Sequence, residues 1–122
     1  VGNVAPVREI SGANTQLNAP IGMLAFGTEI FNDNGGSVTV FNNTDTGNVA
    51  PIRRIAGAAT GINDPRGLFA RPGELFQSEF GNQRVNVFNI NADGNAVPLR
   101  TIVGPNTLMQ SPTGVLIAQS VI

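Results

Sequence analysis

The chain contains no cysteine, histidine, tryptophan, tyrosine or lysine among its 122 residues. Without cysteine and histidine it has neither a thiolate nor an imidazole to serve as nucleophile, general base or metal ligand. Thiol redox chemistry, zinc sites and Ser-His-Asp triads are therefore excluded. The absence of cysteine also means that disulfide bonds do not hold the fold together, and it fits any cellular compartment.

Charge is scarce as well. Charged residues make up 12% of the chain, the net charge is −1, and all 7 cations are arginine. So weak a field does not steer nucleic acid or an anionic membrane, and no nucleic-acid partner is expected. No run of about 18 apolar residues is present, so no membrane span is expected. Because the chain begins at Val1 rather than at methionine, we expect a processed chain or a piece of a longer one.

What the chain does contain is an internal repeat. A nine-residue pattern starts at Gly2, Gly47 and Gly94, so that successive starts lie 45 and 47 residues apart. The three versions read Gly-Asn-Val-Ala-Pro-Val-Arg-Glu-Ile, Gly-Asn-Val-Ala-Pro-Ile-Arg-Arg-Ile and Gly-Asn-Ala-Val-Pro-Leu-Arg-Thr-Ile. So close a match in three places is not explained by chance.

The register of the repeat holds beyond this pattern. A Pro-X-Gly triplet follows in every unit, beginning at Pro20, Pro65 and Pro112. The sequence therefore predicts one repeat region, residues 1–122, divided into units 2–46 and 47–93 and a partial third unit 94–122.

Within a unit the pattern is typical of β-strands. Segments of five to eight residues rich in Val, Ile, Phe and Thr are separated by Gly, Asn, Asp and Pro, and no segment sustains helical periodicity. In the second unit the predicted strands are 48–56, 66–71, 74–79 and 84–90. The side chains expected to be buried between such sheets are Ile30, Phe31, Val38, Val40, Leu75, Phe76, Val85 and Val87.

Proline and glycine place these strands within a sheet. The proline of the repeated pattern, Pro51 in the second unit, falls inside a predicted strand, and because proline lacks a ladder donor this strand is expected at the outer edge. Its apolar residues Ile52 and Ile55 are three apart, and a bulge or twist is one explanation. The Gly-rich strand that contains Gly67 suits a crowded inner position.

A four-stranded antiparallel unit of about 45 residues, repeated in tandem, has the size of a propeller blade. The runs Asn-Asp-Pro-Arg-Gly-Leu-Phe, Gly-Glu-Leu-Phe and Gly-Asn-Gln-Arg-Val-Asn-Val-Phe in the second unit resemble an NHL-type repeat. The chain is similar to bacterial secreted propellers whose blades carry runs such as Gly-Asn-Val-Ala-Pro-Leu-Arg-Thr-Ile. The first unit departs from the motif, since Ile21 stands at the position of Arg66. The resemblance implies an all-β fold of propeller blades but not one function, since such propellers serve as binding platforms, lyases and structural modules.

The chain is too short for a closed propeller. It carries an outer strand, two blades and one inner strand near 113–118, about 2.6 units, whereas closed propellers have about 4–8 blades. Two blades alone leave apolar sheet faces in water, and such faces mark interfaces. Three readings stay open: a piece of a longer propeller, several copies that assemble in a ring or filament, or a different β fold. The expected partner is thus a second copy or further blades.

Three polar residues form the best candidate for ligand binding. Asp64, Arg66 and Glu74 are expected near the loop that enters the inner strand. A structural salt bridge or turn cap, repeated between blades, is the competing reading. Asn42 begins an Asn-Asn-Thr triplet that fits a glycosylation acceptor.

Two short fragments made of Asp, Asn and Gly resemble pieces of calcium loops. They begin at Asp33 and Asp93, and both lack the distal glutamate that completes such a loop. Hairpin turns explain them better. We therefore expect no metal site and no cofactor.

These observations favour a non-enzymatic protein, extracellular or on the cell surface, that acts as a structural, self-assembling or protein-binding scaffold. The alternative is a fragment of a secreted lyase-like or ligand-binding propeller whose active site lies in blades outside this sequence. The lack of histidine and of any recognisable catalytic motif counts against an enzyme.

Overall fold

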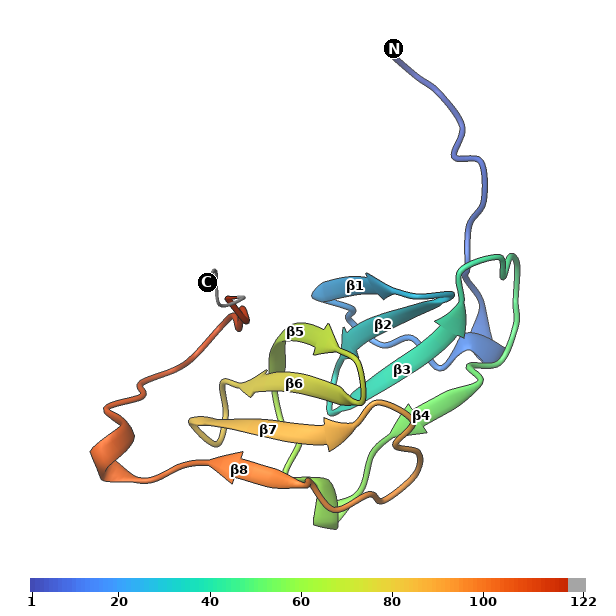
Figure 1. Ribbon diagram of the computed structural model, residues 1–122. Coiled ribbons are helices and arrows are strands. Elements are labelled where there is room, and N and C mark those ends of the chain that lie inside the picture. Colours follow the sequence, from blue (N-terminus) through green and yellow to red (C-terminus); the bar gives the residue numbers. More distant parts are fainter. Residues whose placement is uncertain (119–122) are drawn as a thin grey trace.

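In the computed structural model, which describes residues 1–118, the chain is all-β. These residues form two four-stranded antiparallel sheets whose strands follow one another in chain order (Figure 1). The first sheet contains β1 (Gly22–Phe26), β2 (Glu29–Asn34), β3 (Ser37–Asn42) and β4 (Arg53–Ile55). The second contains β5 (Pro65–Arg71), β6 (Glu74–Glu79), β7 (Arg84–Asn89) and β8 (Arg100–Ile102). The predicted all-β class and its four-stranded antiparallel units are confirmed.

The outermost strand of each sheet comes from the next repeat. β4 belongs to the second unit but pairs with β3 of the first, and β8 of the third unit pairs with β7. The expected outer position of this strand is confirmed, but the expected extent, 48–56, is wrong. Pro51 precedes β4 because proline cannot donate to the ladder; pairing begins where the Ile52 N–H donates to the Val40 carbonyl, at 2.8 Å. Since Ile52 lies outside the strand, its spacing from Ile55 needs no bulge.

The other three strands of the second unit lie where the sequence predicts them. The ranges 66–71, 74–79 and 84–90 agree with β5, β6 and β7 to within one residue at each end. The β-strand propensity of Val and Phe and the turn residues between the strands were sufficient to place them.

The predicted inner strand at 113–118 is wrong, because these residues pair with no neighbouring strand and form none themselves. They run against β5 instead. A Cβ atom added to Gly67 would lie 2.7 Å from the Cα of Gly114 and 2.7 Å from the hydroxyl oxygen of Ser78. The expected crowding at Gly67 is therefore confirmed.

Each unit contains a short 3₁₀ turn: η1 (Ala13–Thr15) precedes β1, η2 (Ala58–Thr60) precedes β5, and η3 (Pro105–Thr107) has the same place in the third unit. In all three turns the threonine hydroxyl donates to the carbonyl of the preceding glycine, at 2.7 Å. At Gly12, φ is 120° and an added Cβ would overlap the side chain of Asn48. That side chain also accepts the Asn14 N–H, at 2.8 Å. The Gly-Asn pattern of one unit thus holds the turn of the unit before it.

The two sheets pack through opposite faces. Along β2, Phe31 lies on one face and Ile30 on the other, and their counterparts in β6 are Phe76 and Leu75. Phe31 and Leu75 are fully buried, whereas Ile30 and Phe76 are only partly buried. The Phe31 face of the first sheet therefore packs against the Leu75 face of the second, with the first strand of each sheet, β1 and β5, side by side (Figure 1). The core between them contains Phe31, Val38, Val40, Ile55, Ala70, Leu75 and Phe88.

This arrangement explains why three of the core predictions fail. The expected burial is confirmed for Phe31, Val38, Val40, Leu75 and Val87. It is wrong for Ile30, Phe76 and Val85, which are only partly buried. These three lie on the two sheet faces that no second sheet covers within residues 1–118.

We expect Phe31→Ala to lower the free energy of unfolding by about 3–5 kcal/mol, because it leaves a cavity between the sheets. Phe76→Ala, at the equivalent position of the other sheet, is the matched control. It is expected to cost less than about 2 kcal/mol, since its ring is already partly exposed. Urea denaturation of dilute protein, followed by circular dichroism, measures both losses. Equal losses would contradict the assignment of opposite faces.

Candidate functional site

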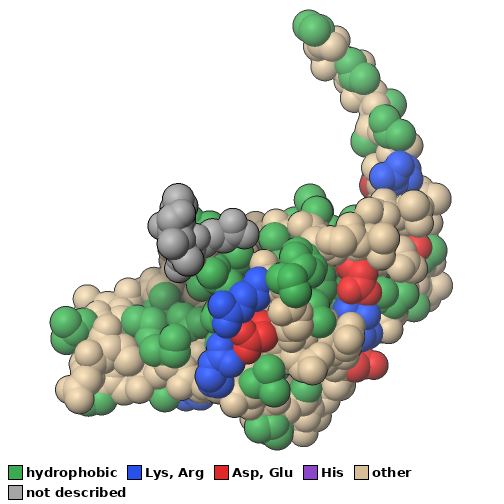
Figure 2. Space-filling view, in the orientation of Figure 1, with side chains coloured by type: hydrophobic (Ala, Val, Ile, Leu, Met, Phe, Trp, Pro, Cys, Tyr) green, Lys and Arg blue, Asp and Glu red, His purple; other side chains and the backbone are tan. Residues whose placement is uncertain are grey.

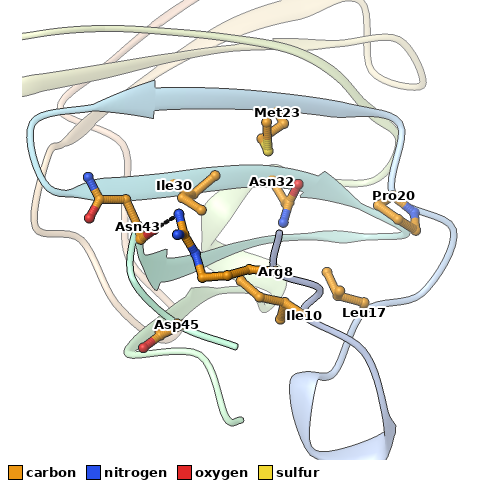
Figure 3. Close-up of a pocket in the computed structure, with 9 residues that line it drawn as sticks. All are labelled: Arg8, Ile10, Leu17, Pro20, Met23, Ile30, Asn32, Asn43 and Asp45. Atoms are coloured by element: carbon orange, nitrogen blue, oxygen red, sulfur yellow. Dashed lines mark hydrogen bonds between the residues drawn. The ribbon is translucent and has the colours of Figure 1, made fainter. Parts of the chain in front are cut away.

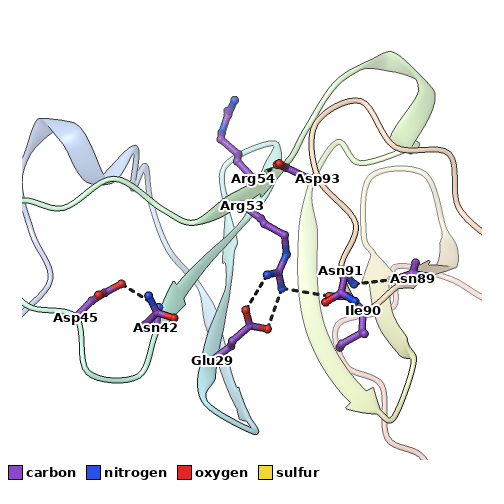
Figure 4. A network of polar contacts seen from close by, with 9 residues as sticks. All are labelled: Glu29, Asn42, Asp45, Arg53, Arg54, Asn89, Ile90, Asn91 and Asp93. Carbon is purple, nitrogen blue, oxygen red and sulfur yellow. Dashed lines mark hydrogen bonds and ion pairs between the residues drawn. The ribbon is translucent and has the colours of Figure 1, made fainter.

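Arg53 connects the two sheets (Figure 4). Its guanidinium donates two hydrogen bonds to the carboxylate of Glu29, at 2.7 and 2.9 Å. The same group donates to the carbonyl of Ile90, which follows the second sheet's β7, at 3.2 Å. The side chains of Arg53 and Glu29 are 16% and 21% exposed, and the hydrogen bond from Arg53 lowers the pKa of Glu29. A two-pronged, half-buried contact of this kind fixes geometry as well as charge.

The same contact begins again at the amino-terminal end of the repeat region. Arg8 is the counterpart of Arg53, and Asn43 is the counterpart of Ile90. The Arg8 guanidinium donates to the carbonyl of Asn43, at 3.0 Å (Figure 3). No carboxylate within residues 1–118 forms an ion pair with Arg8.

At the other end, Arg100 is the third arginine of the pattern. It forms an ion pair with Glu74, the counterpart of Glu29, and Arg71 binds the same carboxylate. The hydrogen bonds from Arg100 and, second, from Arg71 lower the pKa of Glu74 to about 2. Among the described residues, Arg100 donates to Glu74 and to no carbonyl. The arginine is thus held in the position from which Arg53 reaches the next sheet.

The structure separates the predicted constellation of Asp64, Arg66 and Glu74 into two places. The guanidinium of Arg66 donates two hydrogen bonds to Asp64, at 2.8 and 2.9 Å, and lies 4.4 Å from the ring centroid of Phe80. Glu74 begins β6, whereas Asp64 and Arg66 adjoin the far end of that strand. The Asp64–Arg66 contact has the form of the competing structural reading, and a ligand-binding role stays a prediction.

Two further sequence candidates also have defined positions. Asn42 is exposed at the end of β3, and its backbone N–H donates to the carboxylate of Asp45, at 2.9 Å. Its glycosylation stays a prediction. In the fragment that begins at Asp33, only the two glycines form the hairpin turn, because Asp33 and Asn34 are the last residues of β2.

Sequence reasoning missed a group of buried polar side chains at the junction of the sheets. Gln77, Glu79 and Asn86 are fully buried. Glu79 accepts the backbone N–H of Asn63, at 3.0 Å, and Asn86 donates to the side-chain oxygen of Gln77, at 3.0 Å. These contacts satisfy polar groups that burial would otherwise penalise.

Asp33 is buried in the same region but is not satisfied. Neither of its carboxylate oxygens has a hydrogen-bond partner among the described residues. Burial, and second the nearby charge of Glu79, raise the pKa of Asp33 to about 7. The signal in the sequence was the strand alternation, since Asp33 follows Phe31 by two residues and therefore faces the second sheet.

The first sheet carries an apolar hollow of about 330 Å³ on the side away from the second sheet (Figure 3). Leu17, Met23 and Ile30 are among the apolar side chains that line it, and we call these three the leading face. Their counterparts in the second unit are Ile62, Leu68 and Leu75, which pack into the core between the sheets. The hollow is therefore equivalent to the surface of the second sheet that packs against the first, but here no sheet covers it within residues 1–118.

The second sheet carries the complementary surface. We call Phe69, Phe76 and Ile102 the trailing face; their counterparts Leu24, Phe31 and Ile55 pack between the sheets. Ile55 is 1% exposed, whereas Ile102 is 51% exposed. Figure 2 shows basic and acidic side chains next to one another in small groups, with hydrophobic side chains between them.

Comparison with protein-family models, curated proteins and solved structures finds no match to this chain. Residues 1–118 contain no helix long and apolar enough to cross a membrane. The same residues contain no group of three or more His, Cys, Asp or Glu side chains that could hold a metal ion.

Arg53→Lys is expected to lower the free energy of unfolding by about 1–3 kcal/mol. Lysine cannot make two hydrogen bonds to Glu29 and still reach the carbonyl of Ile90. Arg100→Lys is the matched control, and its effect is expected to be small because that ion pair is exposed and stays within one sheet. Denaturant titration measures both, and an equal effect of the two variants would show that the contact with Ile90 is unimportant.

Asp33→Asn tests the buried carboxylate. The pKa of Asp33 is higher in the folded chain than the ordinary value of about 3.9 in the unfolded one. The folded state therefore holds this proton more tightly, and its stability is lost as pH rises from about 4 to about 7. Relative to the variant, the wild type is expected to lose up to about 4 kcal/mol over this range.

Denaturant titrations at several pH values measure this difference, with Glu9→Gln, at an exposed carboxylate, as the control. A constant difference in stability between wild type and Asp33→Asn would contradict the raised pKa.

Proposed function

We propose that this chain is a non-enzymatic scaffold of NHL-type propeller blades that acts by pairing its outer sheet faces with protein, in the first place with copies of itself. One observation carries the proposal: several apolar residues that are buried where the two sheets meet have counterparts that are exposed or partly exposed on the sheet faces that no second sheet covers within residues 1–118. Ile55 against Ile102, at 1% and 51% exposure, is the clearest case.

The blade assignment rests on three features of the strands. Each sheet is four-stranded and antiparallel, its outer strand comes from the next repeat, and the inner strands of the two sheets adjoin. Such units stack because each relies on its neighbours for burial. The resemblance to secreted propellers extends the proposal to an extracellular or cell-surface location.

The use of the polar side chains supports a scaffold as well. Arg53 with Glu29, and Asn48 with Asn14, connect successive units. Arg66 is engaged by Asp64. The Arg53–Glu29 ion pair thus helps to hold successive repeats in order, while the leading and trailing faces offer apolar surface of the kind that marks protein interfaces.

Light scattering on gel-filtered protein, over a wide range of concentrations, tests this proposal. We expect particles heavier than a single chain of 12.7 kDa, with a mass that rises with concentration. A particle with the mass of one chain at every concentration would overturn the self-assembling form of the proposal.

A further inference from the structure

We infer that the trailing face of one copy of this chain docks on the leading face of a second copy and reproduces the contact between the two sheets. This inference rests on the proposed function, and it names the partner, the two surfaces and their orientation. The occupant of the hollow in Figure 3 is then the second sheet of another copy.

The internal contact supplies the template for the apolar part. Between the sheets, Phe31 and Ile55 of one sheet pack with Leu68 and Leu75 of the other. In the trailing face the first two positions are Phe76 and Ile102, and in the leading face the second two are Met23 and Ile30. Every counterpart is apolar, so the two uncovered surfaces match as the two covered ones do.

The polar part of the template is present on both surfaces as well. Arg100 is held by Glu74, as Arg53 is held by Glu29. The carbonyl of Asn43 stands at the rim of the hollow, in the position of the Ile90 carbonyl that Arg53 reaches. In the docked pair Arg100 of one copy donates to this carbonyl of the other, where Arg8 now donates. The arginine thereby fixes the register of the contact.

Two terminal segments overlap at this junction, because they occupy equivalent places in the repeat. Residues 103–118 of the first copy correspond to 11–26 of the second, and 94–102 correspond to 2–10. The segments outside the sheets yield: 103–118 form no strand, and nearly all of residues 1–10 are exposed. β8 of the first copy and β1 of the second both stay in place.

The contact joins the trailing face of one copy to the leading face of the other. The leading face of the first copy and the trailing face of the second stay free. Head-to-tail contacts of this kind close into rings when the rotation permits and otherwise continue as filaments. Two chains that are each blocked on a different surface can still pair once, and then stop.

That property gives the test. Met23→Glu places a charge on the leading face and Ile102→Glu on the trailing face, and both positions are exposed in the single chain, at 69% and 51%. Val97→Glu is the matched control, because Val97 is exposed but lies on neither face. One of the two variants is isotope-labelled, and light scattering and native mass spectrometry follow each alone and an equimolar mixture.

We expect the wild type and Val97→Glu to assemble, and each face variant alone to stay a single chain. The mixture is expected to give pairs of one variant with the other, twice the mass of one chain, and nothing heavier. If the wild type assembles but the mixture does not pair, this inference is overturned and the scaffold proposal stands. If the wild type stays a single chain at every concentration, the proposed self-assembly fails with it.

Circular dichroism checks that each variant is folded. If Met23→Glu does not fold, Leu17→Glu replaces it on the leading face. If Ile102→Glu does not fold, Phe76→Glu replaces it on the trailing face. Their mixture is expected to pair in the same way, and a failure of all mixtures while the wild type assembles overturns the inference.

Discussion

Each sheet of this protein has apolar side chains on both faces, and the rest of the structure depends on what covers them. A sheet of this kind gains little by folding alone, since one covered face leaves the other in water. The buried positions of the two sheets accordingly differ in part. Phe31 is buried and its counterpart Phe76 is partly exposed, while Leu75 is buried and its counterpart Ile30 is partly exposed. At these positions the presence of a covering sheet, rather than residue type, decides whether the side chain is buried.

Polar contacts set the order in which the sheets stack. Hydrophobic contact alone has no direction, and it would allow the sheets to slide or to turn over. Arg53 prevents this because its guanidinium binds Glu29 in the first sheet and also the carbonyl of Ile90, which follows β7 of the second sheet. Asn48 adds a second link between units at the turn that contains Gly12. These residues recur in the repeat because they connect successive units. Charged positions that look like binding candidates in the sequence can therefore have this structural role.

Local structure was the part of the fold that the sequence predicted well. β5, β6 and β7 lie where alternation and turn residues place them, and Gly67 is crowded as expected. The outer strand was overextended because its proline was counted inside the ladder. Residues 113–118 have the composition of a strand, but composition does not provide a pairing partner.

The candidate site was less predictable, because it depends on which end of a strand a residue occupies. Asp64 and Glu74 are ten positions apart in the sequence, yet the hairpin of β5 and β6 places them at opposite ends. Asp33 was assigned to a turn because Asn and Gly follow it in the sequence, whereas β2 continues through it and its alternation with Phe31 places it on the face toward the second sheet.

The last strand of each sheet comes from the following repeat, and this affects how such a chain can lengthen. The sequence repeat and the sheet are out of phase, since residues 47–93 supply β4 to one sheet and β5 to β7 to the next. If a gene duplication inserted a second copy of 47–93 after the first, the new β4 would complete the old sheet and the existing β8 would complete the new one. Growth by whole repeats therefore leaves no sheet with a missing edge, whichever number of units the gene carries.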